Sequence, residues 1–161
     1  LIMFNQNKEE QTNNEKIIQS IKKNDFNTFK DIIENKNINL SSERNLFIRL
    51  IALYNRTDFF FYIFNSERAK EVDFTSEKNY CIRYFSENGN LEVVAALLTI
   101  PKIDTSDFRN LAIRNAYSNN HHKVVDLLWC SHKVQESLKN DDFELYQQLF
   151  HKKTIDNIKN F

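Results

Sequence analysis

The sequence predicts an all-α protein, a helical-repeat solenoid of about four helix-turn-helix repeats followed by a shortened C-terminal capping unit. Three features predict it: a short segment that recurs at near-constant spacing, a turn residue at a fixed distance after it, and apolar pairs at helical spacing beyond that turn. Units of this length cannot bury their apolar faces alone, so they must stack on their neighbours.

The recurring segment is clearest at residues 79–83 (Asn-Tyr-Cys-Ile-Arg) and 110–114 (Asn-Leu-Ala-Ile-Arg), at an offset of 31. Residues 45–49 (Asn-Leu-Phe-Ile-Arg) match the first at an offset of 34, and residues 14–18 fit 31 residues earlier still, without the Arg. We therefore expect repeats that start near residues 14, 45, 79 and 110.

The same offsets place Asn24, Asn55, Gly89 and Asn120 at one equivalent position. These residue types tolerate the left-handed backbone conformation better than others do. Because the chain has a single Gly and a single Pro, turns that need a positive φ must otherwise use Asn or Asp. Each unit is therefore predicted to turn at this position.

After each turn, an apolar pair is followed by a second pair four residues on, which is one face of a helix. The pairs are Thr28-Phe29 with Ile32-Ile33, Phe59-Phe60 with Ile63-Phe64, Val93-Val94 with Leu97-Leu98, Val124-Val125 with Leu128-Trp129, and Leu145-Tyr146 with Leu149-Phe150. The first unit carries Thr28 where the others are apolar, as expected of a terminal unit.

This pattern divides the chain into three parts. Residues 1–13 are polar and rich in Gln and Asn, which predicts a flexible N-terminal segment. Residues 14–153 form the repeat domain, with the capping unit from residue 131, and residues 154–161 form a polar tail.

Residues 88–98 (Asn-Gly-Asn-Leu-Glu-Val-Val-Ala-Ala-Leu-Leu) resemble the turn and second helix of an ankyrin repeat. Residues 119–128 repeat the pattern, with His121 at the ankyrin turn histidine. The resemblance spans about residues 15–151 and is to the degenerate repeats common in viruses and host-associated bacteria. It implies the ankyrin fold and protein recognition through the loop tips and the outer positions of the first helices, with no common catalytic residue.

The sequence departs from the ankyrin pattern at the start of the first helix. Ile82-Arg83 and Ile113-Arg114 stand at the Leu-His positions, and Phe85-Ser86 and Ala116-Tyr117 replace the small Ala-Ala pair. The helices are therefore expected to pack with altered spacing.

The resemblance makes the concave helix and loop surface the expected binding surface. The predicted partner contacts there are Arg49, Leu53, Tyr54, Arg83, Tyr84, Glu87, Arg114 and Ser118. The recurrent Arg49, Arg83 and Arg114 form a row that could bind acidic side chains of a partner by bidentate pairing. The alternative is that each Arg pairs with an acidic residue of a neighbouring unit or binds a loop carbonyl, because buried charges are rarely unpaired.

Phe61 and Tyr62 are two further predicted contacts. They lie outside the core register of residues 59–64, so an exposed aromatic pair could bind a partner or a second copy of the chain. The alternative is a wider core in which both rings pack on the next unit.

The remaining residues give little support for catalysis or for a metal site. His121, His122, Cys130 and His132 match a zinc site weakly, and a Cys/His nucleophile also needs an orienting group and an oxyanion hole. Cys81 and Cys130 are expected to be buried, inert thiols. One glycine cannot build a phosphate-binding or dinucleotide-binding loop. We therefore expect no catalytic residue, no cofactor and no metal.

Charge argues against two further classes of partner. Lys plus Arg equals Asp plus Glu at 22 each, which gives no overall field for nucleic acid or an anionic membrane. No apolar run reaches the roughly 20 residues of a membrane span. The chain lacks a secretory pattern at its start, so a cytoplasmic location is expected, or a host cytosol for a secreted effector.

The leading hypothesis is thus a non-catalytic protein–protein interaction module, with an effector or inhibitor role permitted by the resemblance. The alternative is a self-associating structural or regulatory domain, which leaves a homo-oligomer open. The third hypothesis is a Cys/His-dependent enzyme.

Overall fold

The computed structural model describes the backbone of residues 2–34 and 38–159, and the side chains of these residues except 2–8, 157 and 158. It contains helices and no strand within these ranges. The first helices of the units are α1 (Ile2–Lys23), α3 (Ser42–Leu53), α5 (Ser76–Glu87), α7 (Asp107–Ser118) and α9 (His132–Asp141). The second helices are α2 (Phe26–Ile33), α4 (Thr57–Phe64), α6 (Leu91–Leu97), α8 (His122–Trp129) and α10 (Phe143–Lys159), and a short 3-10 helix, η1 (Glu67–Glu71), follows α4.

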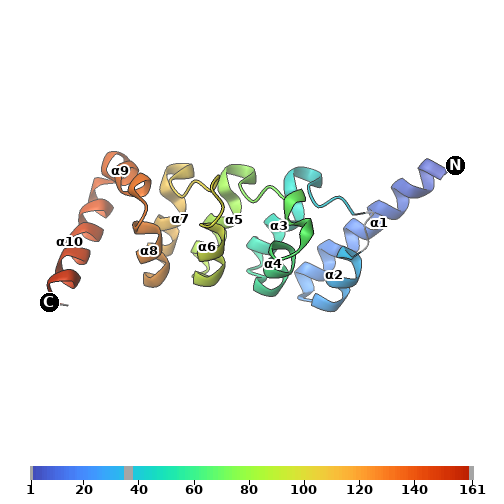
Figure 1. Ribbon diagram of the computed structural model, residues 1–161, viewed down its shortest axis with the longest axis horizontal. Helices are drawn as coiled ribbons and strands as arrows, with labels where there is room; N and C mark the ends of the chain where they lie inside the picture. Colours follow the sequence, from blue (N-terminus) through green and yellow to red (C-terminus); the bar gives the residue numbers. More distant parts are fainter. Residues whose placement is uncertain (1, 35–37, 160–161) are drawn as a thin grey trace.

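The helix pairs line up side by side along the long axis of the molecule, with the termini at opposite ends (Figure 1). Along one row, α1 packs on α3, α3 on α5, α5 on α7 and α7 on α9. Along the other row, α2 packs on α4, α4 on α6 and α6 on α8. Each unit therefore contacts mainly the units before and after it. The prediction of an all-α protein is confirmed.

Each predicted turn has the expected left-handed residue. The φ angles are 58° at Asn24, 50° at Asn55, 70° at Gly89 and 60° at Asn120. The residue after the turn is the N-cap of the second helix. In two units its side chain accepts a backbone N–H from three residues on: Asp25 accepts from Thr28 at 3.1 Å, and Asn90 accepts from Val93 at 3.2 Å. Sequence reasoning located these turns correctly because the αL requirement restricts the residue type.

The apolar pairs of the second helices form the core between neighbouring units. The first residue of a pair faces the preceding unit: the ring of Phe59 lies 4.6 Å from that of Phe29, centroid to centroid. The second residue faces the following unit, as Phe60 does at 5.4 Å from Phe85. All of these rings are buried. The stack is therefore continuous, and each unit depends on its neighbours for burial.

Two predicted boundaries differ from the structure. α1 begins at Ile2, so the segment 2–13, which the sequence suggested to be flexible, is helical and continuous with the first repeat; residue 1 lies outside the described residues. At the other end α10 continues to Lys159 through most of the polar tail, and residues 160 and 161 are not described. Polar composition misled the prediction because a helix continued from a packed segment needs no new nucleation.

Gly89 differs from the three Asn residues at equivalent turns for a steric reason. A Cβ atom on Gly89 would overlap the imidazole ring of His121, which lies at the start of the next second helix. At this turn the αL conformation and the approach of the next unit together require glycine.

We expect Gly89→Ala to lower the free energy of unfolding by roughly 1–2 kcal/mol from the αL conformation alone, and by more because of the overlap with His121. Urea denaturation of Gly89→Ala and of Gly89→Ala with His121→Ala separates the two effects. The second change should relieve the overlap and recover part of the loss. If Gly89→Ala lowers the free energy of unfolding equally in the native and His121→Ala backgrounds, the His121 ring does not closely approach residue 89.

Candidate functional site

A left-handed turn precedes the right-handed part of α3, α5 and α7. Its three residues all have φ between 48° and 61°: Glu43, Arg44 and Asn45; Glu77, Lys78 and Asn79; Phe108, Arg109 and Asn110. Non-glycine residues rarely adopt this conformation, and each such residue costs about 1–2 kcal/mol. Three such residues stand at the same place in each of three units, nine in all, so specific contacts must stabilise them.

The repeated arginines supply such contacts at two of the three turns. Arg49 donates from Nε to the carbonyl of Arg44 at 3.0 Å and from Nη2 to that of Glu43 at 2.9 Å. Arg83 makes the same two bonds to Lys78 and Glu77, at 2.9 and 3.0 Å. These bonds satisfy carbonyls that the left-handed turn directs away from the helix.

Arg114 is engaged differently. Its Nη2 lies 3.6 Å from Oδ2 of Asp142, in the capping unit. The alternative interpretation of the arginine row is thus the one that the structure supports. Arg49 and Arg83 bind carbonyls of the turn, and Arg114 pairs with an acidic residue of the neighbouring unit.

The last residue of each left-handed turn is a buried Asn that reaches the next unit. Asn45 Oδ1 accepts the backbone N–H of Asp73 at 2.8 Å, and Asn79 Oδ1 accepts that of Asp104 at 3.0 Å. Asn79 Nδ2 also donates to Asp107 at 2.9 Å, and Asn110 Nδ2 to Ser137 at 2.7 Å. These bonds fix each unit relative to the next at the level of the first helices.

Three loop segments at equivalent positions, two of which donate to these Asn side chains, share a motif that the sequence analysis missed. In Asn39-Leu40-Ser41, Asp73-Phe74-Thr75 and Asp104-Thr105-Ser106, the first side chain accepts both the backbone N–H and the hydroxyl of the third residue, at 2.6 to 3.0 Å. Desolvation raises the pKa of Asp104, but hydrogen bonds from Lys133 and Ser106 outweigh it and lower the pKa below its usual value. The Asn/Asp-x-Ser/Thr spacing in the same register was the available signal.

The solvent face of each first helix follows the spacing i, i+3, i+4, i+7 and i+8. Eight predicted contacts lie on these faces: Arg49, Leu53 and Tyr54 on α3 or its end, Arg83, Tyr84 and Glu87 on α5, and Arg114 and Ser118 on α7. Because α3, α5 and α7 pack side by side, these residues share one surface, which we call the first-helix surface. Leu53 and Tyr54 are among its most exposed apolar side chains.

An aromatic and cationic group occupies the middle of the first-helix surface, and we call it the Tyr80 cluster. The rings of Tyr80 and Tyr84 stack with centroids 4.1 Å apart and an interplanar angle of 14°. The guanidinium carbons of Arg49 and Arg83 lie 5.9 and 5.5 Å from the Tyr80 centroid, and that of Arg83 lies 4.8 Å from the centroid of Phe108. Burial and a hydrogen bond with Tyr84 raise the pKa of Tyr80 above its usual value, so the phenol stays neutral.

Sequence reasoning included Tyr84 but missed Tyr80 and Phe108. The i, i+4 spacing of Tyr80 and Tyr84 was a usable signal, because it sets both rings on one helix face. Phe108 could not be assigned to this surface, since its position depends on a left-handed turn that contains no glycine.

Phe61 and Tyr62 are half-buried, so the expectation of an exposed aromatic pair was wrong. Phe61 packs edge-on against Phe60 at 5.2 Å, and Tyr62 packs on Phe26 of the preceding unit at 5.7 Å. The Tyr62 hydroxyl donates to Glu34 at 3.0 Å. Both rings therefore belong to a wider core, but Tyr62 packs on the preceding unit and Phe61 within α4, not on the next unit as the alternative had it.

The two cysteines lie in different environments. Cys81 is buried, as expected, and burial raises the pKa of its thiol to about 12. Cys130 is exposed, which corrects the expectation of a second buried thiol: it follows the last core residue of α8, at the position where the helix ends. Within the described part of the chain no three His, Cys, Asp or Glu side chains are grouped to hold a metal ion.

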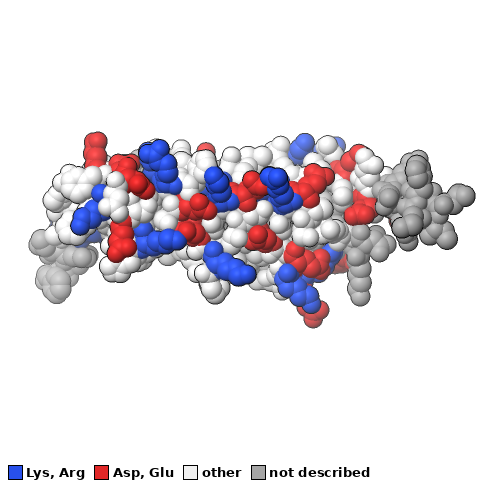
Figure 2. Space-filling model, turned by 90° about the horizontal axis from the view of Figure 1, so that it is seen from above, with Lys and Arg blue, Asp and Glu red and all other residues white. Residues whose placement is uncertain are grey.

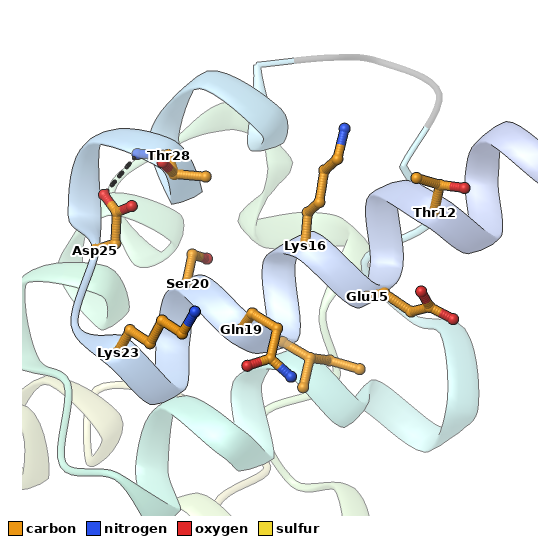
Figure 3. A pocket seen from close by; sticks show the side chains of 9 residues that line it. Thr12, Glu15, Lys16, Gln19, Ser20, Lys23, Asp25 and Thr28 are labelled. Atoms are coloured by element: carbon orange, nitrogen blue, oxygen red, sulfur yellow. Dashed lines mark hydrogen bonds between the residues drawn. The ribbon is translucent and has the colours of Figure 1, made fainter.

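An open concavity of about 550 Å³ lies at the N-terminal end between α1 and α2, and its accessible surface is mostly apolar although most of its lining residues are polar (Figure 3). Its lining includes Lys16, Gln19, Lys23, Asp25 and Thr28. Asp25 is engaged by the N–H of Thr28, and hydrogen bonding to Thr28 lowers its pKa. The concavity combines charges of both signs on a surface open to solvent, which is poorly suited to a small-molecule site.

Charges on the face seen in Figure 2 are interspersed along the long axis, with Lys and Arg alternating with Asp and Glu. Arg44 pairs with Glu77 at 3.1 Å across neighbouring units. No extended area of a single sign is visible on this face, as a nucleic-acid surface would require.

No family model matches this sequence, and neither the curated proteins nor the solved structures include a significant match to it. None of the described helices combines the length and the apolar character that crossing a bilayer requires.

We expect Asn79→Ala to lower the free energy of unfolding by about 1–3 kcal/mol, because it leaves the buried N–H of Asp104 without its acceptor. Asn120→Ala is the matched control, since this exposed Asn also has a positive φ and the substitution carries the same backbone cost. Urea denaturation compares the two variants. An equal effect of both substitutions would contradict the role of Asn79 between units.

Thiol labelling tests the two cysteine environments. At pH 8 we expect Ellman's reagent to label Cys130 rapidly and Cys81 only on unfolding, since burial keeps Cys81 protonated. A Cys130→Ser variant should then be almost unreactive until denaturant is added. Rapid labelling of the folded variant would contradict the burial of Cys81.

Proposed function

We propose that this chain is an ankyrin-like repeat solenoid that acts as a non-catalytic protein-binding module, and that it binds its partner through the first-helix surface. The repeat register, the Asn or Gly turns and the stacking of each unit on the next support the ankyrin-like architecture. The fold alone does not define a partner, so the proposal depends on the surface itself.

The observation that carries the proposal is the Tyr80 cluster. Tyrosine and arginine dominate the energetics of protein interfaces, and a stacked, pre-ordered pair loses little conformational entropy on binding. Tyr80 and Tyr84 are held by their own stacking and by arginines anchored to the backbone. Leu53 and Tyr54, at the end of α3, add exposed apolar area to the same first-helix surface.

The contacts of the arginines define what the partner should offer. Arg49 and Arg83 use the Nε/Nη2 edge of the guanidinium for turn carbonyls, which leaves the Nη1/Nη2 edge for acceptors of a partner. We therefore expect apolar or aromatic side chains of the partner to pack on the tyrosine rings and guanidinium faces, with acceptors at the rim.

The free thiols of Cys81 and Cys130 fit a reducing compartment, and we place the protein in a cytoplasm on that ground. An effector or inhibitor role in a host cell is compatible with the proposal and rests on the ankyrin resemblance alone.

The test is affinity capture from source or host lysate, read by mass spectrometry, with Tyr80→Ala/Tyr84→Ala beside the native chain. We expect a partner that the double variant loses, with affinity reduced at least about tenfold once the pair is measured directly. Leu91→Ser is the matched control, since Leu91 is an exposed apolar residue of α6 in the other helix row.

Circular dichroism must first show that both variants remain folded. Loss of the partner by Tyr80→Ala/Tyr84→Ala and its retention by Leu91→Ser support the first-helix surface. Equal recovery by both variants contradicts it, and loss by Leu91→Ser alone moves the binding site to the second-helix row.

A further inference from the structure

Basic residues recur in two registers of the first-helix surface. One register is the second residue of each left-handed turn, and the other lies five residues further on. The residues are Arg44, Lys78 and Arg109 in the first register, and Arg49, Arg83 and Arg114 in the second. Helices α3, α5 and α7 thus contain six basic residues and four acidic ones, although the whole chain is neutral. The first-helix surface therefore carries an excess of positive charge.

Two of these six basic residues are paired with a carboxylate inside the fold. Arg44 lies 3.1 Å from Glu77, and Arg114 lies 3.6 Å from Asp142. The other four form no ion pair within the part of the chain that the structure describes, and we call them the central basic residues. They are Arg49, Lys78, Arg83 and Arg109.

The acidic residues of the same helices do not neutralise the central basic residues, because most of them are already engaged. Besides Glu77, Asp107 accepts a hydrogen bond from Asn79 at 2.9 Å, and Glu87 accepts one from Asn115 at 2.9 Å. These contacts hold the carboxylates to other groups of the fold. The unpaired positive charge is therefore left for a partner.

The central basic residues border the rings of the Tyr80 cluster. Arg49 and Arg83 lie against Tyr80. The Nζ atom of Lys78 lies 5.2 Å from the ring centroid of Phe108, and Arg109 follows Phe108 in the chain. Lys78, Arg109 and Phe108 are all exposed. Stacked rings bordered by unpaired cations complement a ligand that offers an apolar side chain and carboxylates together.

We propose that the first-helix surface binds a short acidic segment of its partner, in which an aromatic side chain packs on Tyr80 and Tyr84 and Asp or Glu carboxylates pair with the central basic residues. This inference rests on the proposed binding function, because it names the chemistry that the same surface recognises. Lys78 and Arg109 offer their whole charged groups. Arg49 and Arg83 offer the guanidinium edge that the turn carbonyls leave free.

The stacking of the units indicates how the acidic residues should be spaced. Arg49, Tyr80 and Arg109 belong to three successive units, whose first helices pack side by side (Figure 1). Packed helices are about 8–10 Å apart. Three residues of a polyproline II segment advance about 9 Å and bring the side chain back to the same face. A matching segment therefore has an aromatic residue with an acidic residue three positions to either side.

Fluorescence anisotropy with a synthetic probe tests this chemistry. The probe is a fluorescein-labelled nine-residue peptide with Trp at the centre, Glu three residues to either side, and Ser and Pro elsewhere. We expect micromolar binding that weakens at least about tenfold when Gln replaces both Glu residues, since two ion pairs are lost. Tyr80→Ala/Tyr84→Ala should also weaken it at least about tenfold.

Charge reversal in the protein tests the same contacts from the other side. Lys78→Glu with Arg109→Glu should weaken binding of the Glu peptide at least about tenfold and change binding of the Gln peptide little. Lys123→Glu with Lys152→Glu is the matched control, because it changes the net charge equally at exposed residues of α8 and α10. The control should bind the Glu peptide as the native chain does, and circular dichroism checks that both variants fold.

Losses confined to the Gln peptide, the tyrosine variant and the Lys78/Arg109 variant support the proposal. Equal binding of the Glu and Gln peptides overturns it, as does undiminished binding by the Lys78/Arg109 variant or no binding of the Glu peptide at millimolar concentration. An equal loss in the Lys123/Lys152 control also overturns it, since it would show attraction by net charge alone. In each of these cases, a captured partner that Tyr80→Ala/Tyr84→Ala loses still supports the proposed function, so the two failures are distinguishable.

Discussion

The contact on which the first-helix surface depends is the one between a repeat arginine and the carbonyl oxygens of the left-handed turn before its helix. Three consecutive residues with positive φ would be unfavourable by themselves. Arg49 and Arg83 bind the carbonyls that these turns expose, and the buried Asn45 and Asn79 at the ends of the same turns bind the loop of the next unit. The same few residues thus stabilise the strained turns and hold neighbouring units together.

This arrangement also explains why the first-helix surface is ordered. The guanidinium groups that hold the turns lie against Tyr80, and Arg83 reaches the ring of Phe108 in the following turn. The side chains that are available to a partner are therefore held by backbone contacts that the fold itself requires. Pre-organisation of this kind reduces the entropy lost on binding, which supports a recognition role for this surface.

The ends of the stack follow from the same repeat logic. An internal unit has two apolar faces, and a terminal unit must replace one of them. Polar residues do so at the N-terminal end, where Lys16 and Thr28 take positions that are apolar elsewhere. On α10, by contrast, Phe143 and Phe150 are exposed.

The sequence by itself determined the helical class, the four turn positions and the core register, because each depends on local requirements. Positive φ selects Asn or Gly, and helical burial selects apolar pairs at fixed spacing. Only the tertiary structure decided the role of the arginines, the burial of Phe61 and Tyr62, the exposure of Cys130 and the place of Phe108. These depend on what a neighbouring unit places beside each side chain, and on left-handed turns formed without glycine, neither of which composition or spacing encodes.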